Sequence, residues 1–171
     1  SSHDRDAFYA ILNESLDACI KKYLPHFGVE QLSVKEKLKN LVRFFLNVKR
    51  VSGWSLGTWL KNFRYNFFCE QVKGNVLEGK YFIINKYCTI VLESKAQLIL
   101  NAPFYFGNKR IKGSRLDSRL LIESGGRMEI KYGSYNVAYG ADIEVFQNAI
   151  LEIGGELGAN IGLTIICADH I

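Results

Sequence analysis

The sequence lacks the short cysteine motifs that mark zinc sites and redox centres. Its four cysteines, Cys19, Cys69, Cys88 and Cys167, are widely scattered, and no two of them form a Cys-x-x-Cys pair. Each lies in an apolar pattern, as buried free thiols do in proteins of the reducing cytoplasm. We therefore expect a cytoplasmic protein without a metal centre.

Long apolar runs are also missing, and so are basic residues after position 131. No apolar run among the 171 residues is long enough to cross a bilayer. All 22 lysines and arginines lie within residues 1–131, whereas residues 132–171 carry five carboxylates and no cation. The basic part is either a solvated surface or a site for an anionic partner. Such a partner would be a phosphorylated cofactor, an acidic polysaccharide, a lipid head group or nucleic acid.

The last part of the chain has a period of six. Aliphatic residues recur there in two rows, at Val145, Leu151, Leu157 and Leu163 and at Ile153, Ala159 and Ile165. A helix repeats at 3.6 residues and a strand at 2, so six fits neither. It fits a triangular coil of short parallel strands, with about 18 residues per coil and on the order of five coils between residues 80 and 171. The alternative is an ordinary glycine-rich antiparallel β-domain.

Corners of such a coil favour residues that tolerate a positive φ, so Asn148 and Asn160 are expected at corners. Short β-branched and aromatic runs from Tyr81 onward predict further strands. A basic stretch over residues 109–119 separates them and is expected to project from one corner as an exposed loop. Its cations are Lys109, Arg110, Lys112, Arg115 and Arg119.

The first part of the chain has helical periodicity instead. We predict a helix over residues 6–24, a second one starting at a capping box of Ser33 and Glu36, and a third one capped by Ser55. The second is expected to bury Val34, Leu38, Leu41, Val42, Phe45 and Leu46, and the third Leu56, Trp59, Leu60, Phe63 and Phe67. The chain is thus predicted to be mainly β, with an α-helical region over residues 1–72 and a β-helix over residues 73–171.

Four segments carry a family resemblance: WLKNFRYNFF, GSRLDSRLLIESGGRMEI, YGADIEVFQNAILEIGG and NIGLTIICADHI. Over roughly residues 55–171 the chain resembles the bacterial left-handed parallel β-helix acyltransferases, the hexapeptide-repeat proteins. It is most similar to O-acetyltransferases of capsular, lipopolysaccharide or exopolysaccharide sugars, relatives of the maltose and colanic acid acetyltransferases. The resemblance implies acetyl-CoA or another acyl-CoA as donor, a sugar hydroxyl as acceptor, and a homotrimer with active sites between adjacent prisms.

Direct transfer of an acyl group to a hydroxyl needs a general base and donors for the oxyanion, but neither a metal nor a covalent intermediate. His170 is the candidate base, because it follows Ile165 by five residues, as the catalytic histidine does in maltose-type enzymes. Asp169 would orient it on a turn. No residue is assigned to CoA binding, and His3 and His26 receive no role.

A second alignment places the base elsewhere. In the polysaccharide enzymes, the catalytic histidine lies about one coil further on, in an Asp-x-Asp-x-His-like motif that would fall beyond Ile171. His170 is then a corner residue, and the 171-residue chain is a fragment that we expect to have little or no activity.

Two further interpretations are open. One is a non-catalytic solenoid that binds an acidic glycan or a protein partner through the basic loop and the helical region; it would not bind acyl-CoA. The other is nucleic-acid binding. The case for it is weaker, because no recognised nucleic-acid motif is present, and no nucleic-acid partner is expected. The basic amphipathic start, with Lys35, Lys37 and Lys39, also suggests peripheral association with the inner membrane surface.

Overall fold

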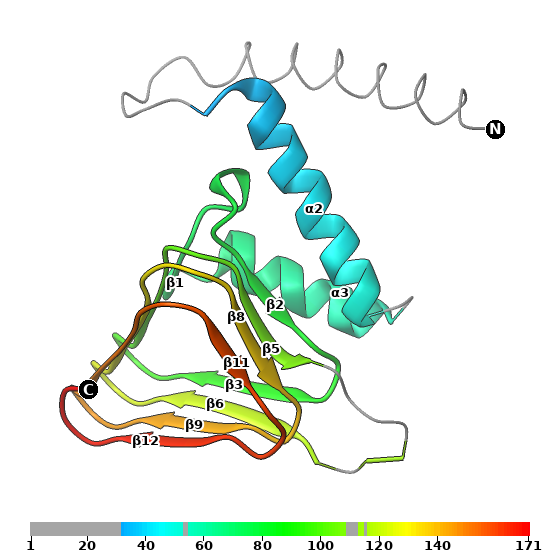
Figure 1. The fold of residues 1–171 in the computed structure, drawn as a ribbon. Helices are drawn as coiled ribbons and strands as arrows, with labels where there is room; N and C mark the ends of the chain where they lie inside the picture. Colours follow the sequence, from blue (N-terminus) through cyan, green and yellow to red (C-terminus); the bar gives the residue numbers. More distant parts are fainter. Residues whose placement is uncertain (1–31, 53–54, 109–112, 115) are drawn as a thin grey trace.

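The computed structural model describes residues 32–52, 55–108, 113–114 and 116–171. Two helices come first, α2 (Val34–Ser52) and α3 (Leu56–Phe63), and a π-helical turn, η1 (Arg64–Phe68), continues α3. The strands that follow coil into a three-sided prism, with α3 against its first coil and α2 extending outward (Figure 1). The helix predicted over residues 6–24 lies outside the described residues.

Each side of the prism is a parallel sheet of four strands. Sheet 1 holds β1 (Val72–Lys73), β4 (Gln97–Leu100), β7 (Arg127–Ile130) and β10 (Ile150–Ile153). Sheet 2 holds β2 (Phe82–Ile84), β5 (Phe104–Asn108), β8 (Tyr135–Ala138) and β11 (Leu157–Ala159). Sheet 3 holds β3 (Cys88–Leu92), β6 (Ser118–Ile122), β9 (Asp142–Val145) and β12 (Thr164–Cys167). The predicted parallel solenoid is confirmed, and the antiparallel alternative is wrong.

The coils are longer and fewer than the period of six predicted. Met128 pairs with Leu151, 23 positions later, and Ile143 pairs with Ile165, 22 positions later. The described strands therefore form four coils rather than about five. A step of six between inward residues is kept across several corners, as from Ile122 to Met128, Val145 to Leu151 and Leu151 to Leu157. Other corners are longer, above all the one between the end of β5 at Asn108 and the start of β6 at Ser118. Extra corner residues lengthen a coil without disturbing the inward alternation of its strands.

Equivalent residues of successive coils stack inside the prism. Phe82, Phe104, Tyr135 and Leu157 are paired in register along sheet 2. The Phe82 and Phe104 rings are parallel within 6° and 5.0 Å apart, close to the spacing of about 4.8 Å between neighbouring strands. This stacking buries one continuous core from the first coil to the fourth, where Leu151 and Cys167 belong to it.

Corners stack in the same way. Lys95, Gly125 and Asn148 occupy equivalent corner positions before β4, β7 and β10, and all three have positive φ, between 59° and 73°. At Gly125, an added Cβ would lie 2.4 Å from Asn148 Oδ1 of the next coil, so this position also needs the absence of a side chain. The predicted corner role of Asn148 is confirmed, and Asn160 lies at the corner between β11 and β12.

Two asparagines close the first edge of sheet 2. The side-chain amide of Asn62 accepts from Ile84 N (2.9 Å) and donates to Ile84 O (2.8 Å). Asn66 does the same with Phe82, at 2.8 Å and 2.7 Å. The distance from Asn62 to Asn66 along the helical segment matches the distance from Ile84 to Phe82 along β2. Four helical residues rise about 6 Å, and two strand residues rise about 6.6 Å. The amides thus replace the missing strand and satisfy an otherwise open edge.

The predicted buried face is confirmed for the aromatic residues, including Phe67 on Phe44, and is wrong for the leucines of α3. Its buried residues are the polar Thr58 and Asn62, whereas Leu56 and Leu60 are 71% and 61% exposed. The prism edge consists of backbone donors and acceptors, so a polar helix face packs on it better than an apolar one. Trp59 and Phe63 do pack, against Phe45 of α2.

The start of α2 is predicted correctly, but its buried face is shifted. Ser33 Oγ accepts from Glu36 N (3.3 Å), and Glu36 Oε2 accepts from Ser33 N (3.2 Å), which confirms the capping box. The fully buried residues are Phe44 and Val48, which pack over sheet 2 and η2 (Val76–Glu78), whereas Leu46 is exposed. Ser55 is the N-cap residue of α3, as predicted, but its side chain makes no capping hydrogen bond.

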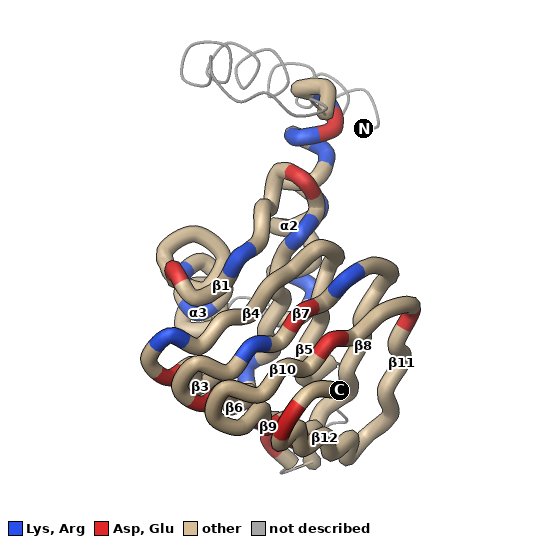
Figure 2. The backbone as a smooth tube through the Cα atoms, turned by 90° about the vertical axis from the view of Figure 1, so that its left-hand side faces the viewer, with Lys and Arg blue, Asp and Glu red and all other residues tan. Residues whose placement is uncertain are grey.

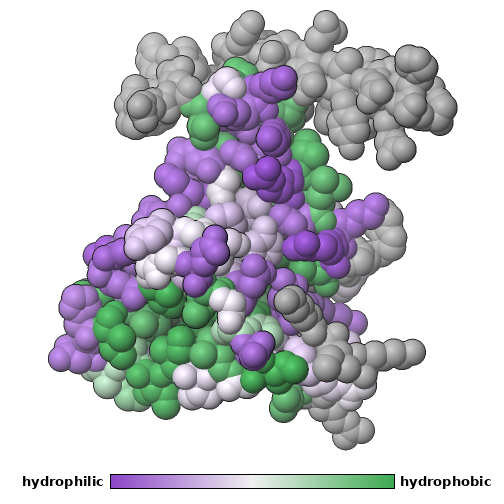
Figure 3. Space-filling model, viewed as in Figure 1, coloured by the Kyte–Doolittle hydropathy of each residue, from purple (hydrophilic) through white to green (hydrophobic). Residues whose placement is uncertain are grey.

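The end of the prism opposite α3 is apolar. The exposed hydrophobic residues of the last coil are Ile161, Ile166 and Ile171. Leu157, Leu163 and Ile165 are partly exposed beside them, and Figure 3 shows this apolar surface on the coil nearest the viewer.

The thiols of Cys88 and Cys167 are buried in the core, and burial raises the pKa of Cys88 to about 11. No helix in the described ranges is long and apolar enough to span a bilayer.

Replacing Asn62 by Ala should lower the free energy of unfolding by about 3 kcal/mol, because it leaves the buried N–H and C=O of Ile84 without partners. Urea denaturation measures the difference. Asn160→Ala, which removes an exposed corner amide, is the control. Equal stability of the two variants would contradict the edge-closing role of Asn62.

Candidate functional site

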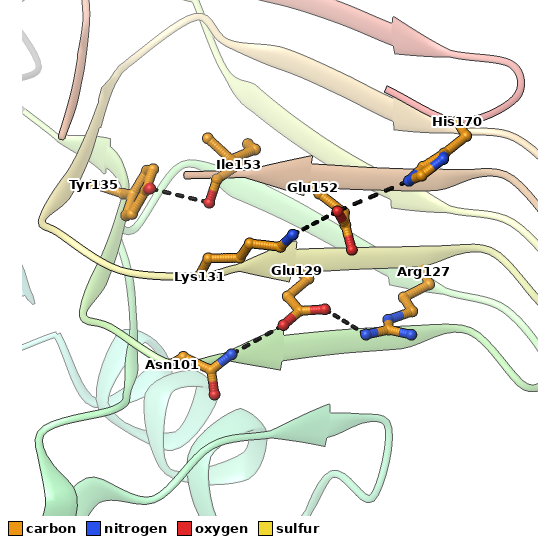
Figure 4. Close-up of polar contacts among 8 residues, drawn as sticks. All are labelled: Asn101, Arg127, Glu129, Lys131, Tyr135, Glu152, Ile153 and His170. Atoms are coloured by element: carbon orange, nitrogen blue, oxygen red, sulfur yellow. Dashed lines mark hydrogen bonds and ion pairs between the residues drawn. The ribbon is translucent and has the colours of Figure 1, made fainter. Parts of the chain in front are cut away.

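His170, the predicted base, lies at the end of sheet 1. Its backbone forms an isolated parallel bridge with Ile150, and Glu152 N donates to Ile171 O (2.8 Å). Its side chain is 62% exposed, and its Nε2 lies 3.8 Å from Glu152 Oε2 (Figure 4). Asp169, which we expected to orient the imidazole, instead accepts a hydrogen bond from Ile150 N through its backbone carbonyl.

The outer face of sheet 1 carries a row of polar side chains that ends at His170. We call this set the polar row; its members are Asn101, Arg127, Glu129, Lys131, Glu152 and His170 (Figure 4). Asn101 Nδ2 donates to Glu129 Oε1 (3.1 Å), and Arg127 forms an ion pair with Glu129. One coil further on, Lys131 Nζ donates to Glu152 Oε2 (2.6 Å). The same carboxylate oxygen therefore faces both Lys131 and His170.

Glu152 is held in its charged form. The hydrogen bond from Lys131 lowers the pKa of Glu152, and the charges of Lys131 and His170 act in the same direction. The same bond raises the pKa of Lys131. At neutral pH the imidazole thus has an ionised carboxylate beside it, 3.8 Å from its Nε2.

Register explains why these residues meet. Glu129 and Glu152 are paired between β7 and β10, and Lys131 N donates to Ile153 O just beyond them. Arg127, Glu129 and Lys131 alternate with the buried Met128 and Ile130. That alternation is visible in the sequence, but the 23-residue offset that brings Lys131 to Glu152 is not, so the sequence does not predict these four residues as partners of His170.

The other predicted residues lie elsewhere or outside the described residues. His3, His26, Lys109, Arg110, Lys112 and Arg115 fall outside the description. Arg119 is in β6 rather than in the loop, and its guanidinium binds Asp142 (2.8 Å) and Glu144 (3.2 Å) on sheet 3. This cation is therefore neutralised by its own sheet, which weakens the case that it attracts an acidic glycan.

A groove of about 490 Å³ lies at the opposite end of the prism, where residues 64 and 68–71 face residues 92–95. Its wall includes Arg64, Cys69 and Glu93 but no histidine. Among the described residues, no group of three or more His, Cys, Asp or Glu side chains is placed to hold a metal ion. Of the three histidines, His170 is the one that the described structure brings to a carboxylate.

Comparisons with known proteins give no relative. No family model matches the chain, and neither a curated protein nor a solved structure matches it.

Replacing Lys131 by Met should raise the pKa of Glu152 toward the ordinary glutamate value, because the main cause of its depression is lost. In the parent protein, stability contributed by Glu152 is present above the pKa of the unfolded state and is lost as the pH falls through the depressed folded value. The variant should not show this loss of stability as the pH falls. Carbon-13 NMR titration of the side-chain carboxyls measures both states.

Lys80→Met is a matched control, because Lys80 binds Glu78 at 2.7 Å far from the polar row and holds the pKa of Glu78 down in the same way. It should raise the pKa of Glu78 and leave the pKa of Glu152 unchanged. A Glu152 midpoint that is the same in the parent and in Lys131→Met would show that the pair does not persist in solution.

Proposed function

We propose that this chain is an acyl-CoA-dependent O-acyltransferase on a left-handed parallel β-helix, with a sugar hydroxyl of a bacterial surface polysaccharide as acceptor. The observation that carries the proposal is the pairing of His170 with the ionised Glu152 on the face of a three-sided parallel prism. The sequence resemblance supplies the reaction class, and the polar row supplies a base suited to it.

His170 acts as the general base through Nδ1. Because Nε2 faces Glu152, an Nε2–H directed at that carboxylate leaves the lone pair on Nδ1 for the substrate. Nδ1 takes the proton of the sugar hydroxyl as its oxygen attacks the thioester carbonyl carbon. The carbon–sulfur bond then breaks, and the thiolate of CoA recovers the proton from the imidazolium.

The separation of 3.8 Å between Nε2 and Glu152 Oε2 exceeds a hydrogen bond and fits a pair that tightens when substrates bind. Exposure of the imidazole agrees with a site completed by a neighbouring copy. We propose that the chain forms a homotrimer in which an adjacent prism covers the polar row and encloses acetyl-CoA.

Isothermal calorimetry with acetyl-CoA is the first test, followed by release of free CoA in the presence of mono- and disaccharide acceptors. His170→Asn should lower kcat by about 10²- to 10⁴-fold with little change in acetyl-CoA affinity, because a general base acts in the transition state. Glu152→Gln should cause a smaller loss, because the imidazole keeps its place but loses the charged group beside Nε2.

His26→Asn is the matched control and should keep full activity. Failure to bind acetyl-CoA would refute the acyltransferase proposal as a whole. Turnover that survives His170→Asn would keep the reaction but place its base at another residue.

A further inference from the structure

An exposed apolar stripe runs along α3 and η1 on the side away from the prism. Leu56 and Leu60 lie one turn apart on α3 and are 71% and 61% exposed. Phe67 of η1 is 45% exposed, and its ring also packs against Phe44 and Phe63. Phe68 is exposed beside the groove that faces residues 92–95. The stripe spans about 16 Å along the helix. Single exposed apolar residues are common, but a stripe of three on one helix usually meets a partner.

The segment of the chain that carries this stripe is rich in cations, and the exposed Glu70 follows it. Residues 32–69 contain eight lysines and arginines but one acidic residue, Glu36. Arg64 follows Leu60 by one turn and is exposed, as are Lys39, Arg43 and Arg50 on α2. Lys61 is turned inward to the carbonyl of Cys88 (2.8 Å).

The opposite end of the molecule has the opposite charge. The coils from residue 132 onward carry five carboxylates and no cation. In Figure 2 the coils stack from α3 at one end to β11 and β12 at the other, with basic positions along α2 and acidic ones near the C-terminal end. Three of these carboxylates pair with Arg119 or Lys131, so the last coil does not strongly repel an anionic surface, but such a surface attracts the helical end of the prism more than the last coil.

We propose that the outer stripe of α3 and η1 docks on the surface of an anionic lipid bilayer. Convex leucine and phenylalanine side chains flanked by Lys and Arg are the features of a helix that lies in the interface, with apolar groups below the head groups and cations among them. No helix in the described part spans a bilayer, so the association is peripheral. The proposal concerns binding alone and stands independently of acyl transfer.

Docking would leave the polar row free for substrates. Asn62 and Asn66, on the inner side of the same helical segment, hold it rigidly on the first coil. The prism axis would then extend away from the membrane, with His170 at the far end of sheet 1.

Co-flotation with vesicles tests the proposal. The full chain should bind vesicles of phosphatidylcholine with 30% phosphatidylglycerol, should bind pure phosphatidylcholine weakly, and should dissociate as salt is raised. Leu60→Glu should reduce binding about ten-fold or more, since it removes an apolar anchor and adds a repelled charge. Ile166→Glu is the matched control, because Ile166 is 57% exposed at the opposite end, and its binding should stay within about two-fold of the parent.

Circular dichroism checks that both variants keep the fold, which is expected because the side chains of Leu60 and Ile166 are exposed. Equal binding by Leu60→Glu and Ile166→Glu, or equal binding to neutral and anionic vesicles, would overturn the proposal. So would an absence of vesicle binding combined with a fall in oligomeric mass for Leu60→Glu, which would assign the stripe to contacts between copies of the chain.

Discussion

The ladder of backbone hydrogen bonds between parallel coils is the constraint on which the rest of this structure depends. The backbone donors and acceptors of each coil are paired with those of the neighbouring coils. The first coil therefore needs a substitute for the strand that would precede it. Asn62 and Asn66 provide it, with each amide donating to and accepting from one residue of β2. Because this edge is polar, α3 packs its polar side inward, and its leucines face outward as a consequence.

The same ladder places the polar row. Parallel pairing puts Glu152 beside Glu129 and carries Lys131 close enough to bind Glu152 at 2.6 Å. Without the lysine, the outer face of sheet 1 would stack two carboxylates in adjacent coils, which repel. Lys131 offsets that repulsion and keeps Glu152 ionised, and this leaves His170 with a charged neighbour. A feature that stabilises the sheet thereby places a carboxylate beside His170.

The two proposals use opposite ends of the prism. The helical end gathers cations and exposed leucines, whereas the last coils gather carboxylates and the histidine. An enzyme that modifies lipid-linked sugars benefits from this separation, since attachment at one end leaves the other open to the acceptor. Each proposal rests on its own residues, and either can fail without the other.

The sequence by itself determined the parallel solenoid, the start of α2 at Ser33 and the corner at Asn148, because each follows from local spacing or backbone preference. It also nominated His170. It did not determine the coil lengths, which range from 22 to 31 residues between paired positions, since corners absorb residues without changing the inward pattern. Tertiary structure alone decided which face of α3 is buried, because that depends on the polarity of the edge it meets. It alone joined Glu152 to Lys131 and His170, because pairing between residues so far apart depends on register, which no local pattern contains.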